Sequence, residues 1–291
     1  MSEDVKTVGV VLAAGASRRL RPHSDGLPKT LVPIPPVPDG GVSNERAPDP
    51  TAGRDLLSEP AADPRPITPL DVILGNFGRS GITDVSIVVG YAAEQVRRRA
   101  PELERAHGVD LRLIHNDRAE TWNNCYSLWC ARSLFDQPVL LCNGDTVHHM
   151  AVESALLNTT VTAPVVLAVD TEKQLGDEEM KVTWSAGSGV RRIEKGLDPA
   201  EAYGEYIGLA RIRPEAAEPL GAALEATWRR DPSLYYEDGF AELIRRASEG
   251  SAGDTAESPM VDVQPIGPEP WIEIDDHADL ARASDVLRGI V

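Results

Sequence analysis

The segment LAAGASRRLRP at residues 12–22, followed by LPKTLVPI at residues 27–34, decides the fold class. It follows a β-branched run, and its small residues let the backbone approach a ligand closely. Exposed amides in such a turn can cradle a phosphate, and Arg19 and Lys29 add positive charge for a triphosphate. A Gly-rich turn alone is common, but the Arg, the Pro-Lys pair and the Leu-Val-Pro-Ile tail in this order favour a nucleotide site. The predicted nucleotide contacts of the turn are Leu12, Ala13, Ala14 and Gly15.

Short apolar runs alternate with helical patterns downstream of this turn. Strands are predicted at 8–15, 84–90 and 109–116, and helices at 69–81 and 92–108. This βαβαβ order predicts an α/β fold, with a mostly parallel mixed sheet and helices on both faces.

The second half of the chain continues the sheet and adds helices. Strands are predicted at 138–147, 163–170, 204–212, 259–266 and 270–274, a β-hairpin at 179–184 and 189–195, and helices at 126–135, 214–230, 235–249 and 277–288. We predict a single domain over residues 1–291 with a flexible insertion at 35–66, which is dense in Pro, Gly, Asp and Ser. The insertion is either a passive surface loop or a lid over the site.

Composition excludes several classes of function. The net charge of -17 and the pI near 4.8 argue against a nucleic-acid binder or an anionic-membrane binder, since both need a basic surface. No apolar stretch is long enough to cross a bilayer, and the acidic start MSEDVK differs from a signal sequence, so we expect a cytoplasmic protein. Cys125, Cys130 and Cys142 have no zinc-type spacing, which favours buried reduced thiols.

A series of motifs in a fixed order accompanies the N-terminal turn. They are GYAAEQ (90–95), HND (115–117), WNNCYSL (122–128), NGDT (143–146), EEMKV (178–182), GEYIG (204–208), LYYED (234–238) and WIEIDD (271–276). With the turn, this order resembles the sugar-nucleotidyltransferase superfamily, whose signature is LAAGxGxRL followed by PKxLxPI. Ser17 stands at the second glycine of that signature. Within the superfamily the chain is most similar to the CTP:phosphocholine and phosphonate cytidylyltransferases, and the resemblance covers most of the chain outside the insertion.

The resemblance implies a Rossmann-like nucleotidyltransferase fold and a magnesium-dependent reaction. The expected enzyme transfers CMP from CTP to a small phosphonate or phosphomonoester, such as 2-aminoethylphosphonate, and releases pyrophosphate. The alternatives are a phosphocholine cytidylyltransferase, a sugar- or cyclitol-1-phosphate nucleotidyltransferase, and a catalytically idle nucleotide-binding subunit. The partners are then CTP and the acceptor, with a homodimer left open. A nicotinamide dehydrogenase is disfavoured because the first turn lacks GxGxxG.

Three acidic residues form the predicted metal site. Asp145 follows a buried strand, and this edge of an α/β sheet is where ligands bind, so its carboxylate can hold Mg²⁺ against the α-phosphate. Glu273 and Asp275 lie two apart on a strand and therefore face the same side, where they can complete the site. The alternatives are a capping role for Asp145 and a solvated acidic strand end for the other two.

Two lysines on the hairpin and two groups of neighbours complete the nucleotide and acceptor sites. Lys181 and Lys195 are catalytic candidates that can bind the acceptor's phosphoryl oxygens, with solvated surface lysines as the alternative. The resemblance assigns Gly90 and Tyr91 to the base or ribose, and we add Asn143 to the nucleotide contacts. It also places Glu205 and Tyr206 at the acceptor.

Further acceptor contacts are expected around the start of a helix and in LYYED. Asn123, Asn124 and Tyr126 open a helix, where an Asn can cap the helix, contact an anion, or do both. Tyr236 and Glu237, together with Trp122 and Tyr235, offer aromatic faces and a carboxylate for an ammonium group. The alternative is that these aromatic residues belong to the core.

Overall fold

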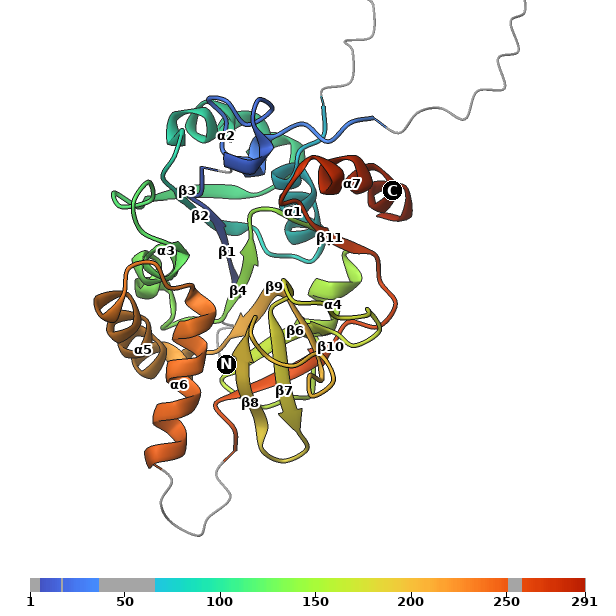
Figure 1. The fold of residues 1–291 in the computed structure, drawn as a ribbon. Coiled ribbons are helices and arrows are strands. Elements are labelled where there is room, and N and C mark those ends of the chain that lie inside the picture. Colours follow the sequence, from blue (N-terminus) through green and yellow to red (C-terminus); the bar gives the residue numbers. More distant parts are fainter. Residues whose placement is uncertain (1–5, 17, 37–65, 251–257, 291) are drawn as a thin grey trace, which may run out of the picture.

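The computed structural model describes residues 6–16, 18–36, 66–250 and 258–290. A nine-stranded sheet runs through the described part of the molecule (Figure 1). Its strands are β1 (Val8–Ala13), β2 (Asp84–Val89), β3 (Asp110–His115), β4 (Val139–Asn143), β6 (Val165–Asp170), β7 (Lys181–Ser185), β8 (Gly189–Glu194), β9 (Gly204–Ile212) and β10 (Val261–Pro265). Their order is β10-β6-β9-β4-β1-β2-β3, and the β7–β8 hairpin joins through β9.

Strand direction confirms the predicted mostly parallel mixed sheet. β1 pairs in parallel with both β2 and β4, β2 with β3, and β6 with β10. β9 is antiparallel to its neighbours β4 and β6. Antiparallel strands can be joined by tight turns, whereas parallel strands need longer crossovers, so the β7–β8 hairpin and β9 form the antiparallel part of the sheet.

Helices cover both faces of the sheet, as predicted. One face carries α1 (Pro69–Arg79), α2 (Ala93–His107) and α4 (Ala151–Leu157), and the other carries α3 (Asn124–Cys130), α5 (Ala217–Arg230) and α6 (Tyr236–Gly250). Val10 and Val11 of β1 are both fully buried but belong to opposite cores. The alternation of side chains along a strand produces this division, because successive residues point to opposite faces.

A separate two-stranded sheet lies beside the main one. β5 (Thr146–His148) pairs antiparallel with β11 (Trp271–Glu273), and both pack with α7 (His277–Ile290) in a third apolar cluster. Within the segment 138–147, the predicted buried strand that leads into Asn-Gly-Asp is confirmed as β4, and the chain leaves β4 at Asn143 and turns before β5. Gly144 permits this turn: its N–H donates to the Leu12 carbonyl, and a Cβ at 144 would lie 2.6 Å from that oxygen.

Buried polar groups anchor β5. His148 is fully buried, its Nε2 lies 2.6 Å from Oε1 of the equally buried Glu153, and its Nδ1 lies 3.1 Å from the Thr146 carbonyl oxygen. Both imidazole nitrogens thus face acceptors, which favours the doubly protonated ring. Asn76 of α1 donates to the His148 carbonyl oxygen at 3.0 Å. The strand that follows Asp145 is therefore fixed by α1 and α4.

The structure also bears on the predicted helix at 126–135, the cysteines and the insertion. The helix predicted at 126–135 divides into α3 and a 3₁₀ turn, η3 (Arg132–Leu134). All three cysteines are free, with Cys125 and Cys142 buried and Cys130 partly buried. In the described part of the chain, every helix is too short or too polar to cross a bilayer. Ser17 and positions 37–65, most of the predicted insertion, lie outside the described residues.

Candidate active site

Three carboxylates converge where the two sheets meet. Asp145, Glu273 and Asp275 each offer an oxygen, and these oxygens lie within 4.8 Å of one another. The β5–β11 pairing explains their convergence: Thr146, next to Asp145, pairs with Glu273, and the Asp145 carbonyl oxygen accepts from the Ile274 N–H at 3.0 Å. Although β11 ends at Glu273, Asp275 still reaches the same cluster.

Two cations lie against these carboxylates. Lys29 Nζ is 2.6 Å from Asp145 Oδ2 and 2.6 Å from Asp275 Oδ1, and Arg19 Nη2 is 3.0 Å from Asp275 Oδ2. Burial opposes the charge of Lys29, but the two aspartates outweigh burial and raise the pKa of this lysine above its ordinary value. Burial alone would raise the pKa of Asp275, yet Lys29 and Arg19 lower it. The predicted cations and the predicted acids thus form one cluster.

The donor set of this cluster fits a hard divalent cation. Carboxylate oxygens are the ligands that Mg²⁺ prefers in proteins, and Mg²⁺ usually takes one or two of them together with phosphate oxygens and water. Three carboxylates so close together repel one another, and a cation relieves this repulsion. Lys29 supplies part of that charge from within the chain.

A first cavity of about 650 Å³ opens on one side of the carboxylates. The predicted turn forms one wall, Asp145 and Lys29 lie at the cluster end, and the β3–α3 loop forms the opposite wall. Of the predicted contacts, those lining this cavity are Leu12, Ala13, Ala14, Gly15, Arg19, Lys29, Asn123, Asn124 and Asp145. The size and the small-residue wall suit a nucleotide.

Gly90 and Tyr91 lie behind this cavity rather than in its lining. The Tyr91 N–H donates to the Ala14 carbonyl at 3.0 Å, and the Tyr91 hydroxyl accepts from the Gly26 N–H at 3.3 Å. A Cβ at Gly90 would lie 2.2 Å from the Cβ of Ala119 and 3.1 Å from the Ala14 oxygen. These residues support the turn that lines the cavity, and their direct contact with the base or ribose stays a prediction.

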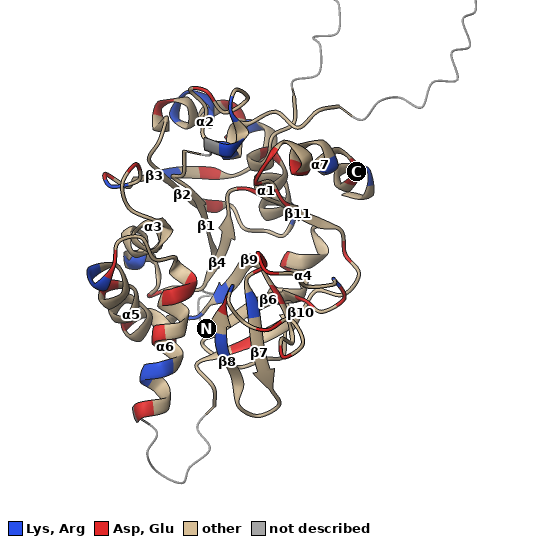
Figure 2. Ribbon diagram, in the orientation of Figure 1, with Lys and Arg blue, Asp and Glu red and all other residues tan. Residues whose placement is uncertain are grey.

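A second cavity of about 400 Å³ opens on the other side of the carboxylates. Its wall contains Glu273 and Asp275, and it shares Arg19, Asn124 and Tyr235 with the first cavity. The acidic lining residues are Glu178, Glu205, Glu237, Glu273, Asp275, Asp276 and Asp279, and the basic ones are Arg19 and Lys195. This is the cavity expected for an acceptor, and its lining is strongly acidic. Figure 2 marks the acidic residues along the ribbon in red, including those near the start of α7.

Glu237 is, with Glu205, one of the two buried acids that line the second cavity. Its residue is 6% exposed, and its Oε2 is buried without a hydrogen-bond partner among the described residues. Burial raises the pKa of this carboxyl to about 7. An unpaired buried carboxyl is costly, so this atom calls for a donor that a ligand can supply.

A layer of tyrosines lies beneath this cavity. The Tyr236 hydroxyl is 2.9 Å from Asn143 Oδ1 and 3.1 Å from the Tyr206 hydroxyl. Tyr206 and Asn143 line the second cavity, but Tyr236 is fully buried below them. The placement of Tyr236 at the acceptor is therefore corrected to support of the cavity floor, and Asn143 faces the acceptor side rather than the nucleotide side.

Two other expectations are corrected by packing. Lys181 is fully buried, and its Nζ donates to the carbonyl oxygens of Gly176, Asp177 and Glu179 at 2.8, 3.1 and 3.2 Å. Its ammonium thus holds a loop and is not offered to an acceptor. Tyr126 stacks on an indole of the same helix and lines neither cavity.

The predicted ammonium cage does not assemble as four residues. Trp122 stacks on Trp228 at 5.4 Å and lines the first cavity, Glu237 lines the second, and Tyr235 lines both. Asn123 caps α3, which is one of the two roles predicted for an Asn at this position. Its side chain accepts a hydrogen bond from the Asn124 N–H at 2.8 Å. Asn124 borders both cavities.

Sequence reasoning missed several residues near these cavities. The loop 119–121 lines the first cavity. The one feature of the sequence that could have indicated this is its position after the parallel strand β3. Lys173 and Trp271 lie in a third cavity beside the acceptor side. Trp271 stands two residues before Glu273, so the same alternation that paired the acids could have placed its ring beside them.

Known proteins resemble this chain in sequence and in fold, although no family model matches it. The CMP-5'-(3-aminopropyl)phosphonate synthase of Streptomyces rubellomurinus is 32% identical over 282 residues, which cover 94% of this chain and 38% of that protein. The choline-phosphate cytidylyltransferase of Streptococcus pneumoniae is 28% identical over 123 residues, which cover 42% of this chain and 38% of that protein. The chain thus spans well under half the length of these curated relatives.

Solved structures give the same indication. The CTP:phosphocholine cytidylyltransferase of Streptococcus pneumoniae superposes with a TM-score of 0.65 at 19% identity, covering 97% of this chain and 100% of that one. The inositol-1-phosphate CTP transferase of T. maritima gives 0.69 at 16% identity, covering 98% and 96%. The predicted fold and the predicted resemblance to the nucleotidyltransferase superfamily are both confirmed.

Proposed function

We propose that this chain, which has the nucleotidyltransferase fold and cytidylyltransferases as relatives, transfers CMP from CTP to a small aminoalkylphosphonate and releases pyrophosphate. One observation carries the proposal: the two cavities meet at the carboxylate cluster. Asp145 lines the first cavity, Glu273 and Asp275 line the second, and their oxygens lie within 4.8 Å of one another. An α-phosphate held in one cavity and an acceptor oxygen held in the other would meet there.

The residues of the cluster suit a direct, in-line transfer. A phosphonate oxygen is already ionised at neutral pH, so its attack on the α-phosphorus needs no general base. The main obstacle is repulsion between two anions, which positioned charges reduce. Arg19 and Lys29 can hold the departing pyrophosphate, and Lys195 can hold the acceptor's phosphonate. Mg²⁺ bound by Asp145, Glu273 and Asp275 would neutralise charge at the α-phosphate.

The second cavity supports an acceptor with a cationic tail. Its lining acids outnumber its basic residues, and one of them, Glu237, has a buried carboxylate oxygen without a hydrogen-bond partner within the described structure. A primary ammonium can donate a hydrogen bond to that oxygen and neutralise the carboxylate. A quaternary ammonium can neutralise but cannot donate, and a sugar hydroxyl can donate but cannot neutralise. This difference favours an aminoalkylphosphonate over phosphocholine and over a hexose phosphate.

The names of the relatives agree with this choice. One contains an aminopropylphosphonate and the other a choline phosphate, and both of these groups carry a cationic nitrogen. Tyr235 lines both cavities and offers an aromatic ring on the acceptor side, which a cation can approach favourably.

Pyrophosphate release with a panel of substrates tests the proposal. CTP, UTP and dTTP are each combined with 2-aminoethylphosphonate, 2-hydroxyethylphosphonate, phosphocholine and glucose-1-phosphate, in the presence of Mg²⁺. We expect the highest kcat/KM for CTP with the aminoalkylphosphonate. A preference for glucose-1-phosphate would overturn the acceptor class, and a preference for the hydroxyalkyl compound would overturn the role of the ammonium group.

A further inference from the structure

The acceptor cavity continues into a third cavity of about 700 Å³. The third cavity lies between β11, the start of α7, and the loop that joins β6 to β7. Both cavities share five lining residues, all acidic: Glu178, Glu205, Glu273, Asp275 and Asp279. They are therefore two halves of one acidic cleft, with the shared carboxylates between them. We call the acceptor cavity the inner half and the third cavity the outer half. The outer half has no part in the reaction proposed above.

Lys173 places an ammonium in this outer half. Its Nζ lies 2.8 Å from Glu205 Oε2, 3.3 Å from Glu179 Oε1 and 5.3 Å from the centroid of the Trp271 ring. Two carboxylates and an aromatic face are the partners that proteins offer to an alkylammonium ligand. We call Trp271, Glu179 and Glu205 the ammonium box.

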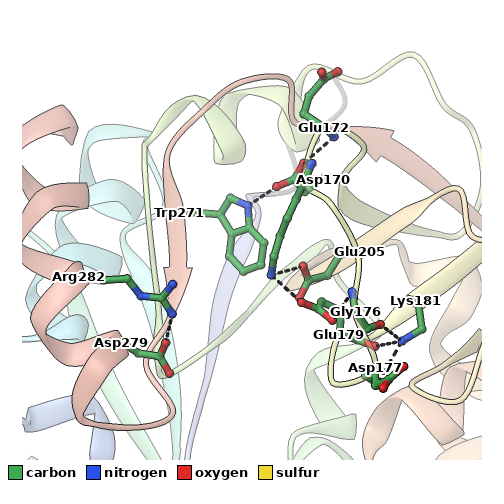
Figure 3. A network of polar contacts seen from close by, with 11 residues as sticks. Asp170, Glu172, Gly176, Asp177, Glu179, Lys181, Glu205, Trp271, Asp279 and Arg282 are labelled. Atoms are coloured by element: carbon green, nitrogen blue, oxygen red, sulfur yellow. Dashed lines mark hydrogen bonds and ion pairs between the residues drawn. The ribbon is translucent and has the colours of Figure 1, made fainter. Parts of the chain in front are cut away.

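Neighbouring groups hold two parts of the box in place, the Trp271 ring and the Glu179 carboxylate. The Asp170 carboxylate accepts from the Trp271 indole N–H at 2.7 Å and from the Lys173 backbone N–H at 3.1 Å (Figure 3). Glu179 comes from a loop whose carbonyl oxygens are held by Lys181, and its own carboxylate accepts from the Gly176 N–H. Asp170 thus aligns both the ring and the lysine that lies against it.

We infer that Lys173 is a specificity-determining residue, whose tethered ammonium fills the box and so limits the length of the cationic tail that the acceptor cleft admits. This inference rests on the proposed function. Lys173 neutralises Glu205, one of the shared acids, from the outer side. A short aminoalkyl tail can use Glu237, which faces the inner half. A longer tail that extends past the shared acids meets the Lys173 ammonium and is repelled by it.

A rival role is direct binding of the acceptor's phosphonate by Lys173. The contacts argue against it, because the ammonium already lies against two carboxylates and an aromatic face, and Lys173 does not line the inner half of the cleft. The two roles differ in their kinetic effect. A phosphonate ligand affects every acceptor alike, whereas a length limit affects long acceptors selectively.

The first experiment compares acceptors of different length in the full chain. For Lys173→Met, we expect the ratio of kcat/KM for 4-aminobutylphosphonate over 2-aminoethylphosphonate to rise by on the order of tenfold, the size of one ammonium contact in a box of this kind. Lys173→Arg keeps the charge and should keep the wild-type ratio. Lys6→Met, at the distant start of β1, is the matched control for loss of a lysine. An unchanged ratio, or an equal loss for both acceptors, would overturn the inference.

The second experiment needs no turnover and therefore separates this inference from the proposed function. In Lys173→Ala, n-propylammonium chloride should raise the melting temperature relative to potassium chloride at equal ionic strength, because the amine enters the space that the lysine leaves. The wild type and Lys6→Ala should show a smaller rise, because only the proposed Glu237 site is open to the amine in them. If the Ala variant does not fold, Lys173→Ser takes its place. A rise no larger than that of the wild type in a folded variant contradicts the inference, even if CTP-dependent activity is present.

Discussion

Lys29 bridges Asp145 and Asp275, with its ammonium 2.6 Å from a carboxylate oxygen of each. Asp145 precedes β5 and Asp275 follows β11, so both acids lie at the same end of this antiparallel pair, and one lysine from the N-terminal segment lies against both. Its side chain is 15% exposed, so the contact is largely shielded from water and from salt. This arrangement gives the carboxylate cluster a counter-ion of its own.

Replacement of Asp145 by Asn should abolish most turnover while the fold persists. The substitution removes a charge at the end of β4 without changing core volume, and it should lower kcat by on the order of a hundredfold or more. Pyrophosphate release under saturating Mg²⁺ measures the effect, and circular dichroism checks the fold. Near-normal turnover would remove Asp145 from the mechanism.

Replacement of Lys29 by Ala should weaken nucleotide use and also lower stability. Loss of the bridging ammonium leaves Asp145 without this counter-ion and Asp275 with Arg19 alone, which should cost about 1–3 kcal/mol of unfolding free energy. The KM for CTP should rise more than the KM for the acceptor. Mg²⁺ should raise the melting temperature of this variant more than that of the wild type, because the metal replaces the missing charge. An effect confined to the acceptor's KM would show that Lys29 does not serve the nucleotide.

Glu237 should lower the free energy of unfolding at neutral pH, although on the proposed function it binds the ammonium group of the acceptor. Its pKa is raised to about 7 from an ordinary 4.5, so the folded state binds the proton more tightly and stability falls as pH rises from about 4.5 to 7. Glu237→Gln should therefore be more stable than the wild type at pH 8, by at most about 3 kcal/mol. The same variant should lose the preference for 2-aminoethylphosphonate over 2-hydroxyethylphosphonate. Denaturant unfolding at pH 5 and pH 8 supplies the first comparison, and a less stable variant at pH 8 contradicts it.

In the buried pair of His148 and Glu153, by contrast, the charged form of the histidine should stabilise the fold. Burial alone would lower the pKa of His148, but Glu153 raises it above the ordinary 6.5. The stabilisation is therefore complete below pH 6.5 and is lost as pH rises through the higher folded-state pKa. Glu153→Gln should cost about 3 kcal/mol at pH 6 and should flatten this decline. Equal pH profiles for variant and wild type would show that the pair does not carry the proton.

Much of the site follows from local rules that a sequence displays. Asp145 was predicted because it follows a buried strand at the ligand-binding edge, and Glu273 and Asp275 because they lie two apart. Lys181 and Lys195 could not be told apart in this way, since both lie on the hairpin. Only the fold shows that the carbonyl oxygens of a neighbouring loop surround Lys181, while Lys195 lines the acceptor cavity.

The aromatic residues show a second limit of sequence reasoning. Trp122 and Tyr235 were grouped with Tyr236 and Glu237 on chemistry alone. The packing of α3 against α5 places Trp122 on Trp228, and the burial of α6 places Tyr236 beneath the cavity floor. Such placements depend on which helices meet, and neither periodicity nor propensity specifies that.

The pairing of β5 with β11 also bears on how the protein is made. During synthesis Asp145 leaves the ribosome long before Glu273 and Asp275, and β5 waits without its partner strand until residues 271–273 emerge. A nascent chain can therefore assemble β1 to β4 and the cavity wall around the N-terminal turn, yet it lacks two of the three carboxylates. If the proposed transfer depends on all three carboxylates, translation products truncated before residues 273–275 should be inactive even where they fold in part.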